Sequence, residues 1–221
     1  MTTISNIEVM TAELHKAFKL INKKFFNNEI PLPAITIQSS GKRLAMGWCT
    51  THEVWRDLEG KVKMYEINLS AEYINVSFEE TMDTLMHEMV HLYNLIKKVQ
   101  DVSRGGTYHN KKFLDQAVKS GFEHKEDKPH KKYGYSFVSL TPVTKAILKE
   151  LPINQTVFTI GRQRPSSFTG INEGNGESVS EVKAKKTSFR WVCLCGNLLR
   201  STKPKMKIIC GDCREHYMQE D

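Results

Sequence analysis

The stretch that decides the fold is "LMHEMVHLYN", residues 85–94. It places His87 and His91 four residues apart, with Glu88 directly after the first histidine. Four residues are slightly more than one helical turn, so both imidazoles would share one face of a helix. Apolar residues cover most of 78–96, which predicts a largely buried helix. The pattern leaves two hypotheses: a zinc site, or a helix that happens to carry two histidines.

Burial of this helix favours the zinc site. Unpaired imidazoles and a carboxylate inside an apolar helix would be energetically costly, and a bound metal removes much of that cost. A catalytic zinc needs neutral imidazole ligands, an open position for water and a carboxylate that takes the proton of that water. His87 and His91 suit the first role and Glu88 the last. The predicted reaction is hydrolysis of a peptide bond, with Glu88 as general base on a zinc-bound water.

A third ligand must come from elsewhere in the chain. His109 is the preferred candidate, because it follows a loop with two glycines and precedes a new helix, so the chain can turn back toward the first two histidines. The alternatives are Asp115, His124 and His130. The last two lie in "EHKEDKPHKK", which is typical of an exposed loop.

The remaining patterns in the first 160 residues alternate between helix and strand. Ser77 and Glu80 fit a capping box, Asn110 and Thr141 fit N-caps, and 100–109 and 51–61 are expected to be loops or turns. Cys49 is interpreted as a small buried residue, with a thiol near the zinc as the alternative. Three tyrosines are candidates for stabilising an oxyanion, with no basis for a choice: Tyr108, Tyr133 and Tyr135. Helices are expected near 10–25, 77–96, 110–121 and 141–151, and strands near 34–40, 45–50, 63–70 and 133–140.

Four of the five cysteines fall within 21 residues, in "CLCGNLLRSTKPKMKIICGDC". Two pairs at this separation suit a structural tetrahedral zinc site without an open position. The predicted ligands are Cys193, Cys195, Cys210 and Cys213. The first pair has a gap of only one residue, which requires a modified first turn, and His216 is an alternative ligand.

Composition divides the chain of 221 residues into three parts. Residues 161–188 are rich in Gly, Ser, Asn, Glu and Lys and predict a flexible linker between a domain at 1–160 and a zinc ribbon at 189–221. Neither a membrane-spanning run nor a secretory signal is recognisable, so a cytoplasmic protein is expected, associated with the nucleoid if it binds DNA.

The chain carries a formal net charge of +7, which favours an acidic partner such as nucleic acid. Residues 178–221 alone contain nine basic and five acidic residues. Arg190 and Trp191 precede a basic loop, and this combination suits contacts to phosphates and stacking on bases. Trp191 is equally suited to the core of a small ribbon. DNA is therefore the expected partner, besides protein substrates.

Four segments together carry a resemblance to a known family: "FFNNEIPLP", the strands with "GWC" and "INLS", "TLMHEMVHLY" and "GGTYHNKKF". Over about residues 8–150 the chain resembles the SprT-like metalloprotease domain. In many members of that family, a C-terminal zinc ribbon follows this domain. The resemblance implies that His87, His91 and His109 bind zinc, that Glu88 is catalytic, and that substrates are proteins bound or crosslinked to DNA. The family usually has glycine after the third histidine, where this chain has Asn110.

These observations predict an α+β protein: a zincin-like metalloprotease domain, with helices packed on a small antiparallel-type sheet, followed by a small β zinc ribbon. Two zinc ions are expected, one catalytic and one structural. The competing hypothesis is a non-catalytic DNA-binding or regulatory protein in which both zinc sites are structural; only an enzyme would require Glu88.

Overall fold

The computed structural model describes residues 6–40, 45–74, 77–162, 188–203 and 205–220. The chain divides into two compact units, Met1–Gly170 and Ile171–Asp221. The predicted linker at 161–188 falls almost entirely outside the described residues. Within the described residues, no helix is both long and apolar enough to cross a membrane.

The first unit is α+β, with four helices among its described residues and several small sheets. Each helix starts at a side chain that accepts a backbone hydrogen bond, as the sequence predicts for three of them. Ser77 and Glu80 form the expected capping box, and Asn6 caps the first helix one turn before the predicted start. The helices are α1 (Ile7–Phe25), α2 (Phe78–Ile96), α3 (Lys111–Lys119) and α4 (Pro142–Glu150).

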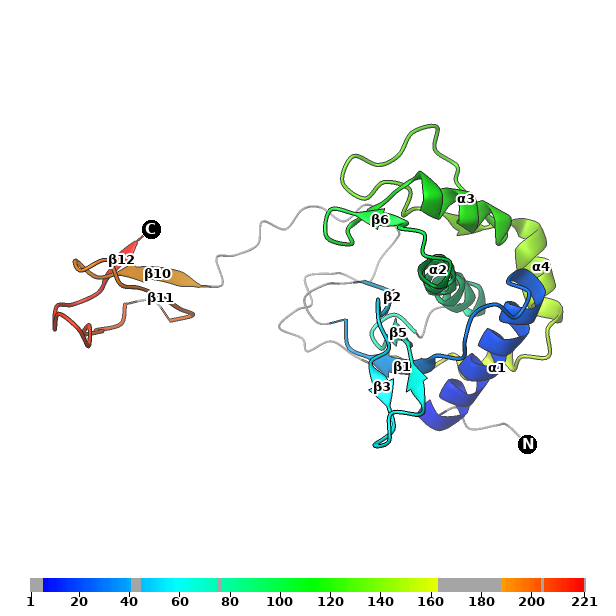
Figure 1. Ribbon diagram of the computed structural model, residues 1–221, viewed down its shortest axis with the longest axis horizontal. Helices are drawn as coiled ribbons and strands as arrows, with labels where there is room; N and C mark the ends of the chain where they lie inside the picture. Colours follow the sequence, from blue (N-terminus) through cyan, green and yellow to red (C-terminus); the bar gives the residue numbers. More distant parts are fainter. Residues whose placement is uncertain (1–5, 41–44, 75–76, 163–187, 204, 221) are drawn as a thin grey trace. The chain divides into compact units, whose positions relative to one another are not determined.

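Helix α2 occupies the centre of this unit. Figure 1 shows it nearly end-on, between a three-stranded sheet on one side and α3 on the other, with α1 and α4 alongside. Its buried residues include Leu85, Met86, Met89 and Val90, none of which is exposed to solvent. The helix that carries the two histidines is therefore largely buried, as predicted.

The sheet beside α2 contains β1 (Ala34–Gln38), β5 (Glu66–Ser70) and β2 (Gly47–Cys49), in the order β1-β5-β2. The prediction of an antiparallel-type sheet was wrong in part, because β1 pairs parallel with β5 while β2 pairs antiparallel with it. Alternating polarity within a strand indicates which face is buried but not which strand lies next to it or in which direction.

Strand β5 is buried on both faces, although "EINLS" alternates apolar and polar residues. Ile67 and Leu69 belong to the hydrophobic core. The polar side chains form a hydrogen-bonded layer instead of facing water: Thr36 Oγ1 donates to Asn68 Oδ1 at 2.9 Å, and Trp55 Nε1 donates to Glu66 Oε2 at 2.6 Å. These bonds offset the cost of burying polar groups.

Several short strands lie in regions predicted as loops, since two-residue ladders leave little trace in a sequence. The expected turn at 51–61 begins a hairpin of β3 (Trp55–Arg56) with β4 (Lys63–Met64), and the expected loop at 100–109 is a hairpin of β6 (Val102–Ser103) with β7 (Tyr108–His109). Conversely, the strand predicted over 133–140 is reduced to β9 (Ser139–Leu140), which pairs with β8 (Phe122–Glu123). The 3-10 helix η2 (Gln155–Val157) completes the unit.

The second unit is a three-stranded antiparallel sheet in the order β11-β10-β12. Trp191 on its central strand is only 3% exposed, so this ring packs into the small core, which was one of its two predicted roles. The strands are β10 (Phe189–Val192), β11 (Leu198–Ser201) and β12 (Met218–Glu220).

Candidate metal centres

Three histidine side chains from two separate elements meet above α2. His87 and His91 lie one turn apart on the helix, and β7 brings His109 to both of them. The Nε2 atom of His109 lies 3.1 Å from Nε2 of His87 and 3.0 Å from Nε2 of His91. The three predicted zinc ligands thus form one cluster that could hold a metal ion.

The spacing of these nitrogens suits zinc. Tetrahedral coordination with Zn–N bonds of about 2.0–2.1 Å separates two ligand nitrogens by roughly 3.3–3.4 Å, close to the separations observed here. Hydrogen bonding alone is a poor explanation for the arrangement, since one neutral imidazole Nε2 cannot satisfy two others at once. The donor set therefore fits a metal with a preference for imidazole nitrogen, such as zinc.

Phe113 forms the floor under the cluster. Its side chain has no exposed surface, and its ring centroid lies 4.8, 4.8 and 4.6 Å from those of His87, His91 and His109. An apolar floor limits the rotation of the imidazoles and keeps water away from their inner faces.

Backbone pairing on two sides holds His109 in place. In the β6–β7 hairpin, Val102 pairs with His109. On the other side, His109 N donates to Tyr133 O at 3.0 Å and Tyr135 N donates to His109 O at 2.9 Å. Gly134 lies between these bonds with a φ of +65°, and a Cβ at this position would overlap the carbonyl of His109. This close approach explains why 133–137 is not a regular strand.

Asn110, which stands where the resemblance leads us to expect glycine, serves the geometry of the third ligand. Its φ of −88° is in the extended region, so no glycine is needed there. Its Oδ1 accepts from Lys112 N at 2.8 Å and caps α3, while its Nδ2 donates to Gln100 O at 3.0 Å. An asparagine after His109 therefore anchors both the loop before it and the helix after it.

Asp101 is a residue of this site that the sequence analysis missed. Its carboxylate accepts from Nδ1 of His91 at 2.8 Å and from Nδ2 of Asn94 at 3.0 Å, and its backbone carbonyl accepts from Asn110 N at 2.9 Å. A proton on Nδ1 of His91 leaves Nε2 with a free lone pair, as metal binding requires. An Asp at the end of a loop gives no sequence signal of this role, because the contact depends on the return of the chain to α2.

Burial and neighbouring charges tune the protonation of the metal-free cluster. Burial, with the charges of the other two histidines, lowers the pKa of His87 well below its usual value, and burial lowers that of His109 to about 4. Both therefore remain neutral at neutral pH, the form that binds a metal. Burial also lowers the pKa of His91, but the hydrogen bond to Asp101 and the charges of Glu88 and Asp101 outweigh it, so this pKa is raised.

Glu88 directly follows His87 on the same helix. It is 7% exposed, and burial, together with the charge of Asp101, raises its pKa to about 7. Gly47 on β2 leaves room for it: a Cβ there would lie 3.1 Å from Cγ of Glu88 and 2.9 Å from the carbonyl of Asn68. A hollow of about 530 Å³ lies one turn before Glu88 along α2, with Thr84 in its wall.

The other sequence candidates lie outside the cluster that the described residues form. Asp115 pairs with Lys111 on the surface of α3. His124 bonds to the backbone of Glu126, and His130 stacks on Tyr133. Cys49 is partly buried and packs against the core, and burial raises the pKa of its thiol.

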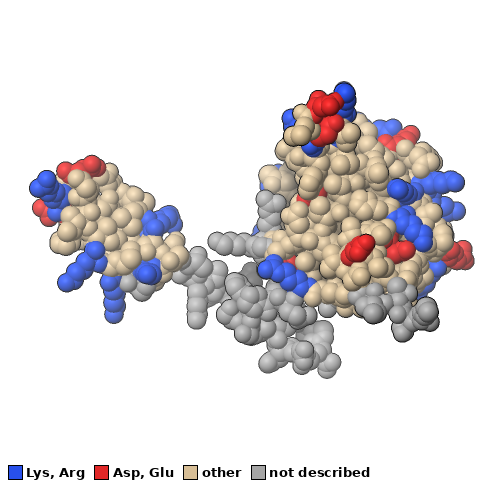
Figure 2. All heavy atoms as spheres, turned by 90° about the horizontal axis from the view of Figure 1, so that it is seen from below, with Lys and Arg blue, Asp and Glu red and all other residues tan. Residues whose placement is uncertain are grey.

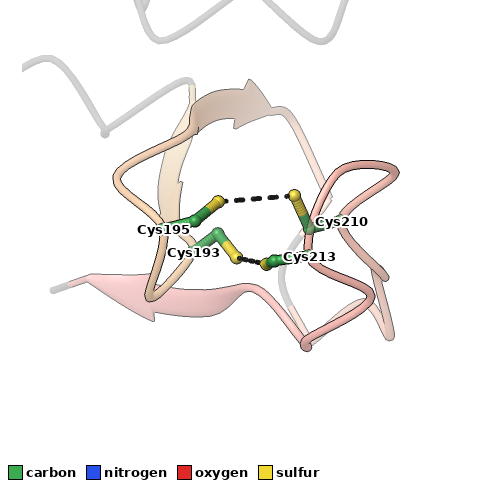
Figure 3. Close-up of side chains that lie close together, drawn as sticks. All are labelled: Cys193, Cys195, Cys210 and Cys213. Carbon is green, nitrogen blue, oxygen red and sulfur yellow. Dashed lines mark hydrogen bonds between the residues drawn. The ribbon is translucent and has the colours of Figure 1, made fainter.

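The second cluster consists of the four C-terminal cysteines, whose sulfurs face one another (Figure 3). Sγ of Cys193 lies 3.2 Å from Sγ of Cys213, and Sγ of Cys195 lies 3.6 Å from Sγ of Cys210. Zn–S bonds of about 2.3 Å separate tetrahedral sulfurs by roughly 3.8 Å, so this donor set also fits zinc. Amides of Cys213 and Asn197 lower the pKa of Cys210 to about 6, which favours a thiolate there. A backbone hydrogen bond lowers the pKa of Cys193 and of Cys195, but hydrogen bonding to Cys213 and burial outweigh it, so both of these pKa values are raised.

A tight turn compensates for the single-residue gap of the first pair. Gly196 N donates to Cys193 O at 2.8 Å, with Gly196 at a φ of +90°, and Cys193 N donates to Asn197 O at 2.9 Å. Both sulfurs consequently point to one centre. His216, the alternative ligand, is not part of the cluster.

Comparison with known families agrees with this geometry. Residues 14–130 match the SprT-like family, and this region contains α2, both hairpins and all three clustered histidines. Comparisons with curated proteins and with solved structures found no match. A family match over more than half of the chain, on the region that builds the histidine cluster, shows that this protein belongs to the SprT-like family.

Proposed function

We propose that this protein is a zinc-dependent endopeptidase with a zincin-like catalytic unit and a C-terminal zinc ribbon. The observation that carries the proposal is the convergence of three imidazole Nε2 atoms, two of them from the helix that also carries the buried Glu88. A purely structural site would need no carboxylate next to its ligands, and a fourth protein ligand would be expected in its place.

His87, His91 and His109 would hold the catalytic zinc, which when bound supplies a Lewis acid for an attacking water and for the substrate carbonyl. Glu88, with a pKa of about 7, is suited to accept a proton from water and to pass it to the leaving amine at neutral pH. Asp101 orients His91. Strand β2 lies at an edge of its sheet and faces α2, so it offers backbone groups that could align an extended substrate.

The substrates that we propose are proteins bound or crosslinked to DNA, with the C-terminal unit as the DNA-binding module. Figure 2 shows Lys and Arg side chains projecting from several sides of this unit. Arg200, Lys203, Lys205 and Lys207 are exposed and suit phosphate contacts. Arg190 pairs with Glu220 at 3.1 Å, and the buried Trp191 is not available for stacking on bases.

The test compares wild type with Glu88→Gln on a DNA-binding protein crosslinked to an oligonucleotide. Glu79→Gln is the control, since Glu79 lies in the first turn of the same helix and pairs with Lys145 and Lys149 of α4, away from the histidines. We expect two zinc ions per chain in all three proteins, and cleavage by wild type and Glu79→Gln only. Equal behaviour of wild type and Glu88→Gln with full zinc content would instead support the alternative, a DNA-binding or regulatory protein with structural zinc.

A further inference from the structure

Two loops beside the third histidine form a surface rich in aromatic and basic side chains. We call it the loop patch and define it by Arg104, Tyr108, Lys131, Lys132, Tyr133 and Phe137. Arg104 joins the two loops, because its Nη1 donates to Lys131 O at 2.9 Å and its guanidinium lies 4.5 Å from the centroid of the Tyr108 ring.

The rings of Tyr133 and Phe137 in the loop patch pack against the neighbouring His130, and Phe137 remains accessible. His130 stacks on Tyr133 with centroids 5.1 Å apart, and Phe137 meets both rings edge-on at 5.4 and 5.9 Å. Phe137 is nevertheless 54% exposed. A phenylalanine held in place by two rings but open to solvent loses little conformational entropy when a flat, apolar ligand stacks on it.

The charge around these rings is mainly positive, although Glu126 and Asp127 precede this segment in the sequence. No acidic residue occurs in 102–114 or in 128–149. Arg104, Lys131 and Lys132 are exposed and form no ion pair with any other described residue, and Lys132 lies 5.0 Å from the Tyr133 centroid. Unpaired cations flanking exposed rings are complementary to a polyanion that also has aromatic faces.

The loop patch is directly attached to the histidine cluster. His109 N donates to Tyr133 O, and Tyr135 N donates to His109 O. Tyr133 therefore belongs both to the loop patch and to the segment that holds the third histidine. A ligand bound there lies next to the proposed catalytic centre, on the same rigid unit.

We propose that the loop patch binds single-stranded DNA, with phosphates on Arg104, Lys131 and Lys132 and a base stacked on Phe137. This inference rests on the proposed action on DNA-bound proteins and adds a DNA contact in the catalytic unit itself. Single strands are favoured over duplexes because stacking on Phe137 needs an unpaired base face. A strand held here would present a crosslinked protein beside Glu88.

The test measures binding of the full zinc-loaded chain to a fluorescent 15-nucleotide oligo(dT) by anisotropy, over a series of salt concentrations. Lys131→Glu/Lys132→Glu should weaken binding at least about tenfold and lower the salt slope by about 1.4, since each phosphate contact on a single strand contributes about 0.7. The matched control is Lys23→Glu/Lys24→Glu, the same change in an adjacent exposed pair on α1, which should stay within twofold of wild type.

Phe137→Ala separates stacking from charge. Loss of one stacked base should weaken single-strand binding about fivefold or more, and leave duplex binding within twofold of wild type. Leu58→Ala, at a fully exposed apolar side chain, is the control. The inference is overturned if Phe137→Ala binds oligo(dT) like wild type, or if it loses equal affinity for single strand and duplex.

Two further measurements keep the result independent of folding and of the proposed function. Ultraviolet crosslinking of wild type to a 4-thiothymidine oligonucleotide, followed by mass mapping, should give adducts within 130–137; adducts in the C-terminal unit alone would overturn the inference. In the anisotropy assay, a second result would likewise overturn the inference: the affinity for oligo(dT) falls in Lys205→Glu/Lys207→Glu but not in Lys131→Glu/Lys132→Glu. That result would leave the proposed role of the C-terminal unit intact. None of these measurements requires cleavage, so a negative Glu88→Gln experiment is a separate result.

Discussion

Replacement of Asp101 by asparagine removes one negative charge and one acceptor from the group that orients His91. The carboxylate now accepts from two donors through the same oxygen, Nδ1 of His91 at 2.8 Å and Nδ2 of Asn94 at 3.0 Å. An asparagine of the same shape offers one acceptor and places an NH₂ group where the carboxylate had a second oxygen. The hydrogen bond to His91 becomes neutral and weaker, and the imidazole less firmly oriented.

The magnitude follows from the role of such partners in metal sites. Loss of a carboxylate behind a histidine ligand typically weakens metal affinity about 10- to 100-fold, or about 1.4 to 2.8 kcal/mol. The loss of metal affinity in Asp101→Asn also depends on pH. Asp101 raises the pKa of His91 and so also stabilises the protonated form that competes with the metal. The difference between wild type and variant should therefore shrink as pH falls below the raised pKa of His91.

The assay is a titration with Co²⁺, in which the thiolate charge-transfer band and the long-wavelength d–d bands report the cysteine site, and the d–d bands at shorter visible wavelength report the histidine site. Asp115→Asn is the matched control, because Asp115 lies on the surface of α3 and pairs with Lys111 of the same helix. We expect weaker binding at the histidine site of Asp101→Asn, unchanged binding at its cysteine site, and no change in the control. Wild-type affinity at the histidine site of a folded Asp101→Asn would refute the reasoning.

Three further predictions concern the support of the site and of the fold. Gly47→Ala should destabilise the protein by about 1–3 kcal/mol, because its Cβ would press on the Asn68 carbonyl and on Glu88; an unchanged urea midpoint would contradict this. Asn110→Ala should lower the free energy of unfolding by about 1 kcal/mol through loss of the α3 cap, and a urea series in which it equals wild type would show that the cap is unimportant. Glu72→Gln should destabilise the fold at pH 7 but not near pH 2. Burial raises the pKa of Glu72, but hydrogen bonds from Ser39 and Ser40 outweigh this effect and lower the pKa from 4.5 to about 2. The carboxylate's contribution to stability is therefore complete above pH 4.5 and disappears as pH falls through 2. Urea midpoints at both pH values test this, and a gap that persists at pH 2 would argue against it.

Local interactions are what the sequence by itself determined. The capping box of Ser77 and Glu80, the Asn110 cap and the Thr141 cap of α4 all appear as predicted, because each involves residues within four positions of one another. The spacing of His87 and His91 belongs to the same class, since one helical turn places both side chains on one face. The apolar residues around them correctly predicted that the helix is buried.

Contacts between distant segments were decided only by the tertiary structure. The parallel pairing of β1 with β5, the fit of Gly47 against Glu88 and the bond from His91 to Asp101 join elements whose approach no local pattern encodes. His109 is intermediate: its place after a glycine loop made it the preferred third ligand, but its distance of 3.0 Å from His91 depends on two ladders and the bend at Gly134. Periodicity reports which face of an element is buried, whereas the identity of the neighbour results from packing the whole unit.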